Sequence, residues 1–122
     1  MDLVASILVI AVALLHAYFL VLEMFLWQTP RGRRTFGTDE AFAARSATLA
    51  ANQGLYNGFL AAGLAWGVLA SDPVAFQVKV FFLGCVIVAG IYGGFTVSRR
   101  ILLVQALPAA VALAAVIVAA QA

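Results

Sequence analysis

Long apolar runs separated by short polar breaks are the main pattern of this chain. Four segments stand out, at about 3–27, 39–70, 74–97 and 101–121. Each is long enough to cross a bilayer as a helix, which takes about 20 mainly apolar residues. The pattern predicts an all-α membrane protein, an antiparallel bundle of four transmembrane helices that forms a single integral membrane domain over residues 1–122.

The polar breaks suggest where the helices begin and end. The first break, at residues 28–34, contains helix breakers and is expected to be a loop. Thr38 stands before two acidic residues, as an N-cap does, so the second helix should start near Asp39. Pro108 lies inside the fourth segment and is expected to kink it.

Composition and charge support the membrane assignment. Of the 122 residues, 66% are hydrophobic and 10% are charged, whereas soluble domains are about 25% charged. The small net charge of +2 comes from arginines clustered in the first and third breaks and their flanks, with only Lys79 on the opposite side. By the positive-inside rule, this distribution of arginines predicts a multi-pass protein of the cell membrane with both termini outside. The basic residues are thus explained by membrane topology, and no nucleic-acid partner is expected.

The N-terminus and the cysteine and histidine content limit the interpretation further. The chain starts Met1-Asp2 without a basic region, so the first segment is expected to be a retained membrane helix rather than a signal peptide. One cysteine, Cys85, rules out an intrachain disulfide. One histidine and one cysteine predict no metal site within a protomer, and the sequence leaves any cofactor unknown.

The strongest candidates for chemistry are an acid and a base in the first segment. A charged carboxylate at Glu23 would cost about 2.5–3.5 kcal/mol in a membrane helix, so it needs a partner, a proton or a function. His16 precedes it by seven residues, close to two helical turns, so the two side chains share one helix face. Glu23 and His16 are therefore the candidate catalytic residues.

Other polar and aromatic side chains are expected at a similar depth, in the cytoplasmic half of the bundle. Alternating helix directions would place them beside Glu23, which suggests a ligand pocket. The alternative is that the amides only hold helices together, at about 0.6 kcal/mol each. The candidate ligand-binding residues are Trp27, Asn52, Gln53, Tyr56, Asn57, Tyr92 and Gln105.

Three blocks of sequence resemble a known protein family. They are residues 16–33, 51–61 and 103–113, and they include the runs Glu-Met-Phe-Leu-Trp and Asn-Gln-Gly-Leu-Tyr-Asn-Gly. The family consists of small integral membrane proteins described as a domain of unknown function, number thirteen hundred and four. The resemblance covers essentially the whole chain and implies a membrane location and four helices, but no activity or substrate.

The function hypotheses come from different classes. In the first, Glu23 and His16 form a binding or acid/base site for a lipophilic small molecule; whether a reaction occurs stays open. In the second, the chain is a small homo-oligomeric proton-coupled transporter, although its outer half lacks polar lining. A structural membrane subunit without chemistry is a third hypothesis, and haem held by His16 across a homodimer axis is a fourth.

The expected partners are membrane lipid, a lipophilic ligand and further copies of the chain. Glycine pairs spaced four apart allow helices to approach closely in lipid, either within one chain or between chains. These pairs are Gly54-xxx-Gly58, Gly63-xxx-Gly67 and Gly90-xxx-Gly94.

Overall fold

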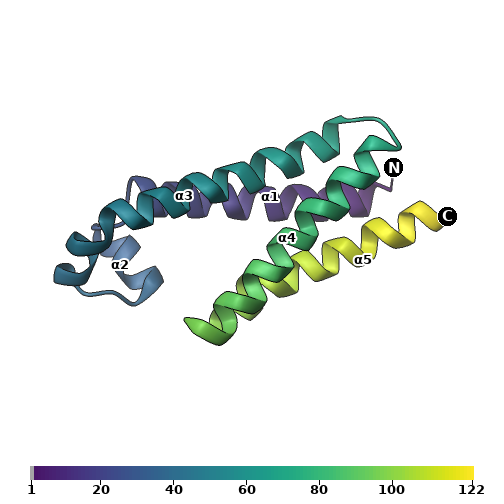
Figure 1. The fold of residues 1–122 in the computed structure, drawn as a ribbon. Helices are drawn as coiled ribbons and strands as arrows, with labels where there is room; N and C mark the ends of the chain where they lie inside the picture. The colour runs from purple at the N-terminus through teal and green to yellow at the C-terminus, as the bar shows by residue number, and fades with distance from the viewer. Residues whose placement is uncertain (1) are drawn as a thin grey trace. The chain divides into compact units, whose positions relative to one another are not determined.

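The computed structural model describes residues 2–122, and this part of the chain is helical and contains no strand (Figure 1). The all-α prediction is confirmed. The helices are α1 (Leu3–Met24), α2 (Pro30–Phe36), α3 (Glu40–Leu69), α4 (Val74–Thr96) and α5 (Leu107–Gln121), with a π-helical segment η1 (Leu102–Ala106) directly before α5.

Three helical segments of the described chain are long and apolar enough to cross a membrane. They are α1, α4 and the continuous stretch Leu102–Gln121. The 30-residue helix α3 is long enough, but Asn52, Gln53 and Asn57 make it less apolar. The helices are therefore those of a membrane protein, while the bundle of four transmembrane helices stays a prediction.

The chain divides into two compact units by its internal contacts. One unit, here called the 14–61 unit, is Leu14–Ala61. The other, the C-terminal unit, combines the chain up to Ala13 with Ala62–Ala122. A single integral membrane domain stays a prediction.

In the 14–61 unit, the second half of α1 packs closely against α3. A Cβ atom added at Gly54 would lie 2.7 Å from Cγ of Met24 and 3.0 Å from Cβ of Glu23. One added at Gly58 would lie 2.6 Å from Cδ1 of Leu20. The first glycine pair therefore lies at a helix contact within this chain, and the contact is tightest at Gly54, where an added Cβ would also lie 3.2 Å from the carbonyl oxygen of Leu20.

Helix α1 ends at Met24, three residues earlier than the sequence predicted. The N–H of Leu26 donates to the carbonyl oxygen of Val21 at 3.1 Å, which closes the last turn. Pro30 restricts the residue before it, and Thr29 is accordingly extended, with φ −74° and ψ 161°. The chain therefore leaves the helix before Trp27.

The first break was predicted to be a loop, and this prediction is wrong, because the break contains the short helix α2. Thr29 caps it, because its hydroxyl oxygen accepts a hydrogen bond from the N–H of Gly32 at 3.3 Å, and Pro30 suits the first helical position. Gly37 ends it in the left-handed region, with φ 68°, and donates its N–H to the carbonyl oxygen of Arg33. Proline and glycine thus mark the ends of a helix here.

Helix α3 starts within one residue of the predicted position, but its cap is Asp39 rather than Thr38. The carboxylate oxygen Oδ1 of Asp39 accepts a hydrogen bond from the N–H of Phe42 at 2.7 Å. An aspartate at this position also suits the positive end of the helix dipole.

In the C-terminal unit, α4 and the η1–α5 stretch form an antiparallel hairpin (Figure 1). The backbones approach closely at Gly90, where an added Cβ would lie 2.6 Å from the backbone nitrogen of Ala106. The end of α3 also packs on α4, because a Cβ at Gly67 would lie 2.6 Å from Cγ of Lys79. The second and third glycine pairs therefore also pack within the chain.

The kink expected at Pro108 takes the form of a π-helical turn. The N–H of Leu107 donates to the carbonyl oxygen of Leu102, five residues earlier. A proline lacks an N–H, and its ring crowds the carbonyl four residues earlier, so a wider turn just before Pro108 relieves the conflict.

Candidate functional site

Glu23 lies at the end of α1, buried against α3, with only 2% of its surface exposed. Its oxygen Oε2 accepts a hydrogen bond from Nε2 of Gln53 at 2.8 Å. Its oxygen Oε1 accepts one from Nδ2 of Asn57 at 2.5 Å. Since Gln53 and Asn57 are one turn apart on α3, the helix presents both amides to one carboxyl group.

These two hydrogen bonds leave the carboxyl group with further capacity to bind. An ionised carboxylate has about four acceptor positions, and the amides use one on each oxygen. A third donor, such as a ligand hydroxyl or ammonium group, could therefore be accommodated without breaking either bond. The site is suited to recognising a hydrogen-bond donor.

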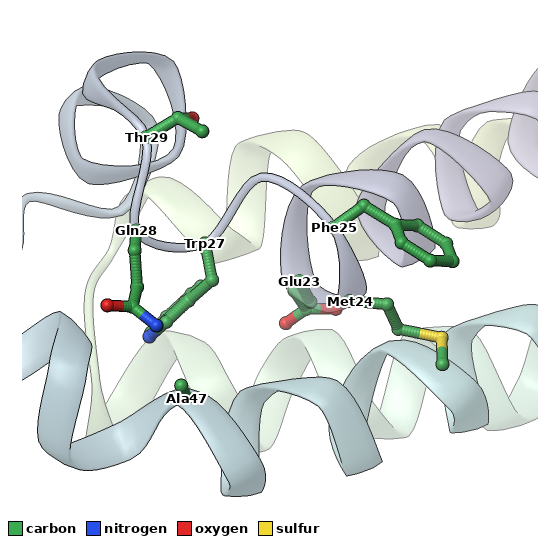
Figure 2. A pocket seen from close by; sticks show the side chains of 7 residues that line it. All are labelled: Glu23, Met24, Phe25, Trp27, Gln28, Thr29 and Ala47. Atoms are coloured by element: carbon green, nitrogen blue, oxygen red, sulfur yellow. The ribbon is translucent and has the colours of Figure 1, made fainter.

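Glu23 also borders a pocket of about 260 Å³ between the end of α1, the turn after it and α3 (Figure 2). Glu23 is the only charged residue in its lining. Trp27 and Gln28 reach from the turn toward Ala47 on α3, as Figure 2 shows. The remaining lining residues are Met24, Phe25 and Thr29.

Trp27 is held in place by a residue that sequence reasoning missed. Its indole Nε1–H donates to the hydroxyl oxygen of Ser46 at 3.1 Å, and that hydroxyl donates to the carbonyl oxygen of Phe42 at 2.7 Å. The Trp27 ring also lies against Phe36, with centroids 4.9 Å apart. A single serine in a helix gives no signal in the sequence, because only the tertiary structure brings it to the indole.

His16 is fully buried on α1, with 0% of its surface exposed. Its ring meets Phe19 edge-on, with centroids 5.4 Å apart and planes at 76°. Glu23 follows His16 by seven positions, which correspond to about 10 Å along the helix axis at 1.5 Å per residue. The acid and the base are thus both buried and two turns apart.

The polar stripe predicted on α3 divides into two parts. Asn57 is buried, and Gln53 is exposed but hydrogen-bonded to Glu23. Asn52 and Tyr56, by contrast, are exposed and are not the donors to Glu23. The 100° step per residue explains this, because only one edge of the stripe faces α1.

Comparison with known proteins identifies the family. A family model described as "Protein of unknown function (DUF1304)" matches residues 10–117. The chain belongs to this family. It is also similar to "Uncharacterized protein YpaA" of Lactococcus lactis subsp. lactis (strain IL1403), with 32% identity over 107 residues that cover 86% of this chain and 89% of the relative. No solved structure matches it.

The other candidate residues of this DUF1304 protein belong to the C-terminal unit. Tyr92 lies on α4 with 72% of its surface exposed. Gln105 lies in η1 and is half-buried. The structure thus brings together Glu23, Gln53, Asn57 and Trp27 within the 14–61 unit.

Lys79 is a buried charged residue that the site prediction did not include. Only 3% of its surface is exposed, in the second turn of the apolar helix α4. Its place within an apolar run was the signal available in the sequence.

Proposed function

We propose that this DUF1304 protein binds a lipophilic small molecule within the membrane through the carboxyl group of Glu23. The observation that carries the proposal is a buried carboxyl group that has both oxygens hydrogen-bonded and still lines a pocket. Acidic residues in membrane helices are rare and usually serve a function.

The pocket suggests how such a molecule would be recognised. A hydroxyl or ammonium group of the ligand would donate to a remaining lone pair of Glu23, held in place by Gln53 and Asn57. Its apolar body would pack against Met24, Phe25 and the Trp27 ring. His16 is the proposed second acid/base group, and Asn52 and Tyr56 on α3 are the proposed outer ligand contacts.

The proposed setting is an antiparallel arrangement of four transmembrane helices in the cell membrane, with both termini outside. Helix α3 would be the fourth spanning helix. Its amides Gln53 and Asn57 bond to Glu23, which lowers the cost of placing them at membrane depth. The arginines of the first and third breaks support this direction.

The test is mass spectrometry of small molecules that copurify with the full-length protein. Glu23→Gln keeps the side-chain shape, and the amides can rotate to restore hydrogen bonds, so the variant should fold. Glu40→Gln removes one acidic charge at the exposed start of α3 and is the matched control. We expect wild type and Glu40→Gln to retain the same bound species and Glu23→Gln to lose at least about 90% of it, as expected for loss of a charge-assisted hydrogen bond.

Equal recovery of every copurifying species from wild type and Glu23→Gln would contradict the proposal. It would also favour the structural-subunit hypothesis, since the carboxyl group would then serve packing alone.

A further inference from the structure

A second pocket, of about 220 Å³, lies on α2 and is lined by Pro30, Arg33, Arg34 and Thr38. We propose that this pocket binds the phosphate group of an anionic membrane phospholipid. Glu23 does not line it, so the proposal is independent of the one above.

The two arginines supply the charge for such a site. The Nε–H of Arg33 donates to the carbonyl oxygen of Gln28 at 3.3 Å, which orients the guanidinium group. This bond does not involve the two terminal nitrogens of the group. Arg34 is exposed at the same pocket. Guanidinium groups form paired, charge-assisted hydrogen bonds to phosphate oxygens, so two at one pocket favour a phosphate ligand.

Thr38 supplies a hydroxyl group that lacks a partner. Its Oγ1 atom is buried and makes no hydrogen bond within residues 2–122. Buried hydroxyl groups in proteins nearly always have a partner. Because Thr38 lines the pocket, rotation about its Cα–Cβ bond can turn the hydroxyl toward a phosphate oxygen there.

The position of α2 in the chain points to a lipid as the source of the phosphate. The helix starts six residues after the end of the apolar helix α1. Between them, Phe25 is 71% exposed and Trp27 lies in the turn, as aromatic residues do at membrane interfaces. Basic clusters directly beside a membrane helix attract anionic headgroups, at about 1 kcal/mol for each arginine.

Nearby acidic groups do not cancel this charge. Asp39 and Glu40 follow Thr38 in sequence, and neither lines the pocket. One oxygen of Asp39 is already used to cap α3. Arg31 adds a further positive charge on α2, although it faces Tyr18, with Nη1 3.4 Å from the hydroxyl oxygen.

Native mass spectrometry of the detergent-solubilised protein tests the proposal, with phosphatidylglycerol and phosphatidylcholine as probes. Wild type should bind phosphatidylglycerol preferentially. The double variant Arg33→Gln/Arg34→Gln should weaken that binding about tenfold or more, from the loss of two arginines. Thr38→Val should weaken it several-fold, because valine matches the shape of threonine without its hydroxyl. The matched control, Arg99→Gln/Arg100→Gln, removes the same charge from exposed positions in the C-terminal unit and should weaken the binding much less than Arg33→Gln/Arg34→Gln does.

Two results would overturn the proposal. One is an equal loss of phosphatidylglycerol in both double variants, which would indicate attraction by net charge alone. The other is displacement of the lipid by millimolar inorganic phosphate, which would identify a soluble phosphate as the ligand.

Discussion

At the scale of single residues, the carboxyl group of Glu23 is the central feature of the site, and the residues of α3 around it bind it or make room for it. A buried polar group without partners is costly, and Gln53 and Asn57 remove most of that cost by donating to its two oxygens. Gly54 contributes as well, since a side chain there would meet Cβ of Glu23. Three positions on α3 are thus matched to one acid on α1.

Asn57→Ala should destabilise the protein, because it leaves one oxygen of Glu23 buried without its donor. The expected loss is about 1–3 kcal/mol in the free energy of unfolding. Asn52→Ala is the matched control, since Asn52 is exposed, and it should change stability by less than about 0.5 kcal/mol. Unfolding by sodium dodecyl sulfate in mixed micelles measures both. Equal effects of the two substitutions would show that the hydrogen bond to Glu23 contributes nothing to stability.

At the scale of helices, glycines decide how closely neighbouring elements approach. A Cβ added at Gly90 would collide with backbone atoms of Ala106, so the close packing of α4 and η1 requires a residue without a side chain at this position. Gly84 on the same helix faces open space, with nothing within 4 Å of an added Cβ. The spacing of glycines alone therefore does not reveal which of them are at a contact.

Gly90→Ala should destabilise the protein, whereas Gly84→Ala should not. Gly90→Ala forces α4 and η1 apart, at a cost of about 1–3 kcal/mol in the free energy of unfolding. Gly84→Ala adds a better helix former in open space and should be neutral or stabilising by up to about 1 kcal/mol. Unfolding in mixed micelles, compared with wild type, measures both shifts. A tolerated Gly90→Ala would mean that α4 and η1 do not pack as described.

At the scale of the whole molecule, the distribution of charge along the chain is the main constraint on membrane topology. Arginines flank the apolar segments at the first and third breaks, whereas both chain ends and the connection around Asp72 lack them. Helices of this kind insert with their basic loops in the cytoplasm. The proposed topology follows from that asymmetry.

The proposed topology predicts an extracytoplasmic C-terminus. An alkaline phosphatase fusion after Ala122 should be active, because this reporter folds only outside the cytoplasm, and a fusion in the first break after Arg34 should be inactive. Reversal of both activities would contradict the proposed direction and the placement of the Glu23 site in the cytoplasmic half.

The sequence alone determined the helical class, the family and the approximate helix positions. Apolar runs of this length leave few alternatives to helices, because backbone polar groups in lipid must be satisfied within the segment. The starts of α3 and α4 and the end of α4 were predicted to within about one residue. Hydropathy also identified Glu23 and the amides of α3, since polar side chains are conspicuous in apolar helices.

Only the tertiary structure decided which polar residues meet. It assigned Gln53 and Asn57, but not Asn52 or Tyr56, to Glu23, because the rotation of α3 about its axis depends on packing against α1. It also brought Ser46 to the indole of Trp27, 19 residues away in sequence. Helix α2 became recognisable only once its caps were seen, since Thr29, Pro30 and Gly37 are equally typical of a loop. Local patterns fix where a helix can form, whereas contacts between helices fix which face each one presents.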